Sequence, residues 1–306
     1  MSVGSRSAGQ ARDVSRREHY SELYDPSSRP VDGRPLALVH GNCQAEALRV
    51  VLDASPTIGW HLVRVPPVHE LTADDLPDLD ALLGACTLLV AQPVREGYRG
   101  LPLGTAEVAA RLAPGAKVVR WPVVRWAGLH PFQAIVRAAD GAEPPVVPYH
   151  DLRTLTGRSP ACPDLVGAAE QSLAELARRE QRDTDIAVSD LLVGLGAGAA
   201  YTLNHPGNAL LLALAGRVQQ ALDRPADAAD PGRVLLGGVR TPLEPAALAA
   251  LGVPVELARD HWLIGGEPVS ADVVQQAQSA WYAARPDVVQ AGLARYPERL
   301  ALLGLG

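Results

Sequence analysis

The sequence predicts an α/β protein in which a parallel sheet is followed by a mainly helical C-terminal half. Between residues 36 and 121, short apolar runs without polar alternation are separated by segments with helical spacing. Strands joined through helices pair in parallel, and a parallel sheet covered on both faces has strands of this kind. After about Leu129 this alternation of apolar runs and helical segments stops, and a proline-rich stretch leads into helical sequence.

Four strands and the helices between them account for the first half. The apolar runs that predict the strands are Leu36–His40, His61–Val65, Thr87–Ala91 and Lys117–Trp121. Apolar spacing predicts the first helix over Gln44–Asp53. Thr72 is expected to cap a second helix, and Thr105 a third that continues to Leu112. A sheet that begins with such a βαβ unit is Rossmann-like or SGNH-like.

Helices dominate the second half. The predicted helices are Leu165–Arg182, Asn208–Leu222, Pro245–Leu251 and Ala271–Ala284. Ser270 is expected to cap the last of them and Pro286 to end it, and one further strand is predicted at Val234–Leu236. The resulting organisation is a flexible N-terminal arm (1–34) with at most a short helix around Arg16–Tyr24, an α/β domain (35–150) and a mainly helical part (151–306).

Composition excludes several classes of protein. The net charge of −6 and the absence of a long basic run argue against a nucleic-acid partner. We expect a cytoplasmic protein without a membrane span, because the N-terminus lacks a signal sequence and no apolar stretch reaches spanning length. The three cysteines are far apart, which fits a reducing compartment, and no motif has metal-ligand spacing. We therefore expect no metal.

The sharpest motif is Gly41-Asn42-Cys43-Gln44, which follows the first strand and opens the first helix. Ligands of parallel sheets bind at the carboxyl ends of the strands, and the backbone N–H groups at a helix N-terminus favour negative charge. Such groups lower the pKa of a thiol and can hold an oxyanion. A buried structural cysteine explains this position equally well.

Asn204-His205-Pro206 precedes a leucine-rich helix and is the second motif. Pro206 makes the turn rigid, so His205 is held in place, and a neutral imidazole near a thiol can act as its general base. A capping turn with a surface histidine is the more common outcome for such a segment.

Other candidates have weaker context. Gln92, Arg95, Tyr98 and Arg99 follow the third strand, where the arginines are suited to phosphate or carboxylate. His130 follows the fourth strand, and Tyr149 and His150 form part of a titratable segment. The chain has no GxSxG elbow, and its cysteine at the strand end counts against SGNH-type ester hydrolysis, which normally uses serine there.

Taken in order, these motifs resemble the WcbI family of polysaccharide biosynthesis proteins, which are regarded as coenzyme A-binding acetyltransferases. The resemblance spans roughly Leu36 to Leu214 and includes the segment from Trp121-Pro122 to His130-Pro131. It implies acyl transfer from acetyl-CoA to a hydroxyl of a sugar or specialised metabolite.

In this scheme Cys43 is the nucleophile, His205 moves the proton, and Asn42 and the N–H of Gln44 hold the oxyanion. The substrate- or CoA-binding candidates are Gly41, Gln92, Arg95, Tyr98, Arg99, His130, Tyr149, His150 and Asn204. Two alternatives stay open: a Cys-dependent thioesterase or amidase-type hydrolase, and a non-catalytic CoA- or nucleotide-binding module. The acceptor and the oligomeric state, a homo-oligomer included, also stay open.

Overall fold

The apolar runs of the first half form one four-stranded parallel sheet in the computed structural model of the chain, which describes residues 14–306. Neighbouring strands follow the order β2-β1-β3-β4. The strands are β1 (Leu36–His40), β2 (His61–Val63), β3 (Cys86–Ala91) and β4 (Lys117–Arg120). The predicted α/β fold is therefore confirmed. The chain leaves β1 first towards β2 and later reaches β3 on the other side, so a topological switch point lies between β1 and β3.

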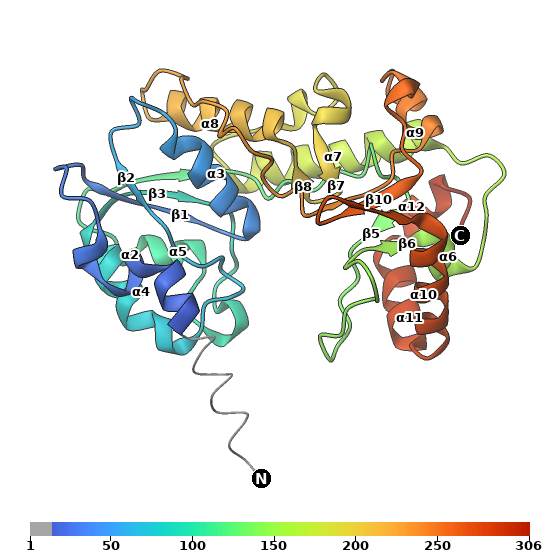
Figure 1. The fold of residues 1–306 in the computed structure, drawn as a ribbon, viewed down its shortest axis with the longest axis horizontal. Helices are drawn as coiled ribbons and strands as arrows, with labels where there is room; N and C mark the ends of the chain where they lie inside the picture. Colours follow the sequence, from blue (N-terminus) through green and yellow to red (C-terminus); the bar gives the residue numbers. More distant parts are fainter. Residues whose placement is uncertain (1–13) are drawn as a thin grey trace, which may run out of the picture. The chain divides into compact units, whose positions relative to one another are not determined.

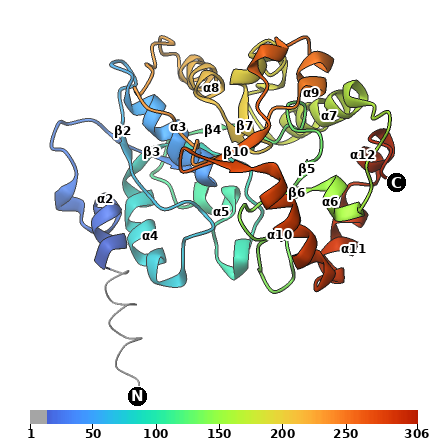
Figure 2. The ribbon, with the colours of Figure 1, turned by 45° about the vertical axis from the view of Figure 1, so that its right-hand side comes forward.

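Helices cover both faces of this sheet, with α3 on one face and α4 and α5 on the other (Figures 1 and 2). Their bounds are α3 (Cys43–Asp53), α4 (Leu76–Ala85) and α5 (Thr105–Ala109), and 3₁₀ turns are η2 (Ala73–Asp75) and η3 (Tyr98–Gly100). Thr72 and Asp75 form the capping box before α4. The prediction for the third helix was wrong at both ends: Gly104 is the N-cap, because the Thr105 hydroxyl is donated to the Gln92 carbonyl, and the helix ends at Ala109.

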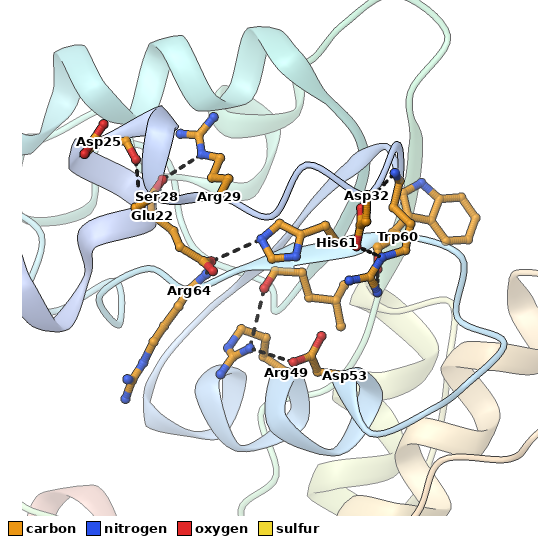
Figure 3. A network of polar contacts seen from close by, with 12 residues as sticks. Glu22, Asp25, Ser28, Arg29, Asp32, Arg49, Asp53, Trp60, His61 and Arg64 are labelled. Carbon is orange, nitrogen blue, oxygen red and sulfur yellow. Dashed lines mark hydrogen bonds and ion pairs between the residues drawn. The ribbon is translucent and has the colours of Figure 1, made fainter.

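The N-terminal segment packs against this sheet where the structure describes it. Residues 14–19 are helical, followed by α2 (Ser21–Tyr24) and η1 (Pro26–Ser28). Leu23 is buried in the core shared with α4. The Glu22 carboxylate accepts the N–H of Arg64 and lies 3.3 Å from Nε2 of His61 on β2 (Figure 3). The short helix expected around Arg16–Tyr24 is therefore present and packed, and the rest of the predicted arm up to residue 13 lies outside the described residues.

An ion pair also attaches this segment to α4. Both guanidinium nitrogens of Arg16 contact the carboxylate of Asp75, at 2.7 and 2.9 Å, and the Tyr24 hydroxyl donates to the same carboxylate at 2.7 Å. Burial disfavours the charged form of Asp75, yet the hydrogen bonds from Arg16, Tyr24 and Thr72 outweigh it and hold the pKa of this carboxyl well below its usual range.

The chain divides into two compact units whose boundaries differ from the predicted ones at 34 and 150. Of the described residues, the first unit contains 14–122, 183–186 and 212–232, and the second contains 123–182, 187–211 and 233–306. Two later segments return to the first unit through specific contacts. The backbone N–H of Asp185 donates to the carbonyl of Arg120 at 2.8 Å. Gln219, on helix α8 (Asn208–Ala221), donates to Ser55 at 2.9 Å.

Short strands accompany the helices of the second unit. The remaining helices and 3₁₀ turns are α6 (Leu152–Thr156), α7 (Leu165–Asp183), η4 (Ser189–Leu191), η5 (Gly196–Gly198), α9 (Pro245–Ala250), η6 (Val255–Leu257), α10 (Ala271–Ala283), α11 (Pro286–Arg295) and α12 (Pro297–Leu302). The strands are β5 (Gln133–Ala134), β6 (His150–Asp151), β7 (Ala200–Thr202), β8 (His205–Pro206), β9 (Val239–Arg240), β10 (His261–Ile264) and β11 (Glu267–Ser270). No helix among residues 14–306 is both long and apolar enough to cross a membrane.

One prediction for this half was wrong. Val234–Leu236 is not a strand, and Leu236 has a φ of 55°, which lies outside the extended region. Helix α10 ends before Pro286, as predicted, and Pro286 also begins α11, because the first position of a helix does not need a backbone N–H donor.

Candidate functional site

The turn after β1 brings the first motif to the carboxyl edge of the sheet, at the switch point. Asn42 is the N-cap of α3, and its Oδ1 accepts the backbone N–H of Gln44 at 2.9 Å. Cys43 is the first residue of the helix. The structure therefore places the Cys43 thiol at a strand-to-helix turn, as predicted, within the first unit.

Gln92, at the end of β3, holds this turn from the neighbouring strand. Its Oε1 accepts the N–H of Asn42 and its Nε2 donates to Oε1 of Gln44, both at 2.9 Å. A Cβ at Gly41 would lie 2.4 Å from Oε1 of Gln92, so glycine is required for this close approach. Gln92 is buried, which gives it a positioning role in place of the predicted contact with substrate.

Opposing effects act on the pKa of the Cys43 thiol. Burial raises its pKa, while the backbone N–H groups of Cys43 and Gln44 act in the other direction, and the charge of Glu70 adds to the rise. The net result is a thiol that is protonated at neutral pH. The side chain of Cys43 is partly buried, whereas Cys86 is buried and Cys162 is exposed.

One detail differs from the predicted oxyanion site. The N–H of Gln44 is already donated to Oδ1 of Asn42, at 2.9 Å. A negative oxygen at this turn would have to compete for the Gln44 N–H, so the assignment of both groups as oxyanion donors stays a prediction.

The loop after β3 carries the other predicted residues of the first unit. Arg95 is exposed, and it has no hydrogen-bond or ion-pair partner among residues 14–306. Arg99, in the left-handed region with φ of 56°, donates to the carbonyl of His69. Tyr98 packs on the core cluster of α4. Arg95 is thus the residue of this loop that retains a guanidinium available to a ligand.

The second motif lies in the second unit, where a hydrogen-bond network holds the turn of His205. The Thr202 hydroxyl donates to the Tyr149 hydroxyl at 2.9 Å, and Tyr149 in turn donates to Oδ1 of Asn204 at 3.0 Å. Nδ1 of His205 is 3.5 Å from the Tyr149 hydroxyl, and the two rings are perpendicular. Tyr149 and Asn204 therefore position the turn.

The imidazole of His205 is in its neutral form at neutral pH. Burial lowers its pKa below the ordinary value, and the carbonyl of Leu236 offsets only part of this effect. A neutral imidazole can accept a proton, as a general base must. Cys43 and His205 lie in different units, and their approach to one another stays a prediction.

His150 is withdrawn from the candidate site. It is buried, its Nδ1 is 2.7 Å from the Tyr282 hydroxyl, and its Nε2 is 3.2 Å from the carbonyl of Val136. Burial lowers its pKa to about 4. With both nitrogens engaged inside the unit, this histidine supports the core.

His130 lines a cavity of about 760 Å³ that lies entirely within the second unit. The sequence had singled out His130 but not Gln133, Thr241 or Trp262, which line the same cavity. Gln133 lies close to His130 in the sequence. Thr241 and Trp262 come more than a hundred positions after His130, and no local sequence pattern marked them as cavity residues. Among residues 14–306, no cluster of three or more side chains is suited to a metal ion.

Comparison with known proteins identifies a family and a similar fold. The model of a family described as polysaccharide biosynthesis enzyme WcbI matches residues 36–227. A solved WcbI structure is similar over 89% of this chain and 99% of that chain, with a TM-score of 0.74 and 22% identity. It is described as a novel polysaccharide biosynthesis enzyme, in native form without a disulfide bond between coenzyme A and a cysteine. No curated protein matches the chain. At this identity, the solved structure supports the fold alone.

Proposed function

This chain belongs to the WcbI family of polysaccharide biosynthesis enzymes, and we propose that it transfers an acyl group from an acyl thioester such as acetyl-CoA to a hydroxyl of a saccharide or specialised metabolite. The observation that carries the proposal is the position of the Cys43 thiol at the start of α3, beside the backbone N–H groups of Cys43 and Gln44. The description of the similar solved structure, which names coenzyme A and a cysteine, adds support.

The proposed reaction has two steps. The sulfur of Cys43 attacks the thioester carbonyl carbon, its proton passes to His205, and the CoA sulfur leaves and takes that proton. The acceptor hydroxyl then attacks the acyl-Cys43 carbonyl, His205 takes the hydroxyl proton, and the Cys43 sulfur leaves and is protonated again. Splitting the transfer in this way replaces one difficult step by two easier ones.

The protonation states of the two groups at neutral pH fit these roles. The Cys43 thiol, whose pKa is raised by burial, needs a base to remove its proton, and His205, whose pKa is lowered by burial, is neutral and can accept one. Both pKa shifts work against this transfer, so it depends on the N–H groups that stabilise negative charge on sulfur. The N–H groups at the start of α3 stabilise negative charge on sulfur or on the carbonyl oxygen. Arg95 is the proposed contact for the donor phosphates, since its guanidinium is exposed at the same edge of the sheet.

One observation favours a second candidate, a CoA-binding module without catalysis. The raised pKa of Cys43 means that little thiolate is present at neutral pH without a base. If no base reaches the sulfur, the cysteine would only orient the thioester.

Turnover of acetyl-CoA in the presence of candidate saccharides tests the proposal. Wild-type protein should release CoA and form an acetylated saccharide, both followed by chromatography and mass spectrometry. Cys43→Ala should lower the rate by several orders of magnitude, and Asn42→Ala by roughly a hundredfold or more, since one oxyanion contact contributes less than a nucleophile. Cys162→Ser is the matched control, because Cys162 is exposed and lies in the other unit.

The products separate the alternatives. Release of acetate at the same rate with and without saccharide would identify a hydrolase. Tight binding of coenzyme A without any release of acetyl groups would identify the binding module. Near-full turnover by Cys43→Ala would show that the nucleophile has been misassigned.

A further inference from the structure

Five arginines of the second unit gather around Tyr296 and form what we call the arginine cluster. Four separate parts of the chain supply them, namely the loop after β4, the segment after β5, helix α7 and the consecutive helices α11 and α12. The members of the cluster are Arg125, Arg137, Arg179, Arg295 and Arg299.

Contacts of Tyr296 hold several of these segments together. The guanidinium carbons of Arg295 and Arg299 lie 5.7 and 4.4 Å from the centroid of the Tyr296 ring. The Tyr296 hydroxyl is bonded to the backbone N–H and carbonyl of Ile135, at 3.2 and 2.8 Å, two residues before Arg137. The positive charges are therefore built into the packing of this unit.

Arg125 lacks a counter-charge. Only Nε of its guanidinium is fully buried, and that atom has no hydrogen-bond partner. Nη1 and Nη2 are accessible, and no hydrogen bond or ion pair engages them among residues 14–306. Burial lowers the pKa of Arg125, and the charges of Arg179, Arg295 and Arg137 lower it further. The accessible nitrogens thus face solvent in a strongly positive environment.

Arg299 adds a positive charge that is buried. The residue is 5% exposed, and its Nε and Nη2 are without hydrogen-bond partners. Burial lowers its pKa, the charge of Arg295 acts in the same direction, and Tyr296 and Glu175 act against them. These nitrogens are too deeply buried to contact a ligand, but the charge of Arg299 still adds to the local field.

Nearby carboxylates do not neutralise the cluster. Glu175 and Glu298 both accept hydrogen bonds from Nε2 of Gln171, at 2.9 and 3.3 Å. Within the described part of the chain, neither carboxylate forms an ion pair with an arginine of the cluster. Burying a charge without a partner is unfavourable, and like charges repel one another. An anion bound at the accessible nitrogens would relieve both costs.

The donors of the cluster suit a phosphate group. Arg125 and Arg137 have free guanidinium groups among residues 14–306, and exposed Arg295 uses its Nε for the Tyr296 hydroxyl at 3.2 Å. A guanidinium group presents its N–H donors as a planar fork that matches phosphate oxygens. A phosphate carries up to two negative charges on several oxygens, whereas a single carboxylate compensates one arginine.

We propose that the arginine cluster binds a phosphate group of a small-molecule ligand through Arg125, Arg137 and Arg295, with the buried charge of Arg299 adding to the attraction. The proposal goes beyond acyl transfer, because the binding requires neither Cys43 nor an acyl group. The phosphate belongs either to the acyl donor or to a separate phosphorylated compound, and the test distinguishes these two sources.

Isothermal titration calorimetry of the full chain with pyrophosphate, at constant ionic strength, tests the site. The wild type should bind this probe. Arg125→Met and Arg295→Gln should each weaken it by roughly tenfold or more, as expected for the loss of a hydrogen bond to a charged group. Arg125→Lys keeps the charge without the fork and should have an intermediate affinity. Arg233→Gln is the matched control, because Arg233 is exposed, lies in the same unit and is outside the cluster.

Thermal stability distinguishes binding from a structural role. Arg125→Met removes a partly buried charge without a partner, so its melting temperature without ligand should equal or exceed that of the wild type. Inorganic phosphate should raise the melting temperature of the wild type and of Arg233→Gln, but not that of Arg125→Met. If Arg125→Met does not fold, Arg295→Gln answers the same question from an exposed position.

Three outcomes would overturn the proposal: no heat with pyrophosphate, wild-type affinity in both Arg125→Met and Arg295→Gln, or an equal loss in Arg233→Gln, which would show attraction by net charge alone. Titration with coenzyme A identifies the source once the site is established. If its affinity falls in the cluster variants and pyrophosphate competes with it, the phosphate belongs to the donor. Unchanged affinity for coenzyme A, together with lost pyrophosphate binding, supports a separate compound. Failure of acetyl transfer alone would leave pyrophosphate binding intact.

Discussion

The side chain of Gln92 and the backbone of Asn42 are joined by a hydrogen bond of 2.9 Å that links the ends of β3 and β1. The second end of the Gln92 amide reaches Gln44 at the same distance. This bridge crosses the topological switch point and fixes the turn from which the Cys43 thiol projects. The geometry of the candidate nucleophile therefore depends on a residue fifty positions further along the chain.

Replacing Gln92 by leucine should destabilise the first unit. The buried N–H of Asn42 would lose its acceptor, at a cost of about 1–3 kcal/mol, which corresponds to roughly 2–4 °C of melting temperature for each kcal/mol. Thermal denaturation followed by circular dichroism measures the effect. Gln220→Leu, on the exposed side of α8, is the control. An equal change in both variants would contradict the bridging role of Gln92.

The capping role of Asn42 predicts a graded response. Asn42→Ala removes the acceptor for the Gln44 N–H and should cost about 1 kcal/mol of stability, whereas Asn42→Ser retains a good N-cap and should cost little. Melting temperatures of the two variants provide the comparison. Equal stability of alanine and serine at this position would show that the cap contributes nothing.

The raised pKa of Cys43 predicts slow alkylation at neutral pH. Only the thiolate reacts, so the rate with iodoacetamide should continue to rise at pH values where N-acetylcysteine has already reached its plateau. Mass spectrometry of the Cys43 peptide follows the reaction, and Cys43→Ser identifies the background. A plateau at a lower pH than that of N-acetylcysteine would mean that the helix N-terminus outweighs burial.

Asp75 should contribute stability that depends on pH. Its pKa in the folded protein lies below the unfolded value of about 3.9, so the contribution is fully present above that pH and is lost as the pH falls through the folded pKa. Asp75→Asn should lower the melting temperature at pH 7, and the difference from wild type should shrink below about pH 4. Asp74→Asn, next to it and exposed, should show no such trend.

Much of the fold could be predicted because its signals are local. Buried parallel strands read as apolar runs, and Ser270 caps α10 as expected, with its hydroxyl accepting the N–H of Asp272. The β10–β11 hairpin was missed although Gly265 and Gly266 at its turn, both with positive φ, are a recognised hairpin signal. The division into units was missed because it depends on contacts, such as that between Arg120 and Asp185, which no local pattern shows.

Local signals also predicted part of the candidate site. The position of Asn42 and Cys43 at a strand-to-helix turn follows from sequence spacing, but the pairing of Asn42 with Gln92 requires knowledge of strand order. His150 has the same residue type and a similar context to other candidates, and only its partners Tyr282 and Val136 show that it serves the core. A sequence therefore shows which titratable side chains a protein has more readily than it shows where those side chains lie in the fold.

Intact-protein mass spectrometry after incubation with acetyl-CoA tests the central claim most directly. The account predicts an increase corresponding to one acetyl group, located by peptide mapping on Cys43, that is absent in Cys43→Ala, retained in Cys162→Ser and lost when a saccharide acceptor is added. His205→Ala should slow its formation. Acetylated saccharide produced without any acetylation of Cys43, and at the same rate by Cys43→Ala, would contradict it.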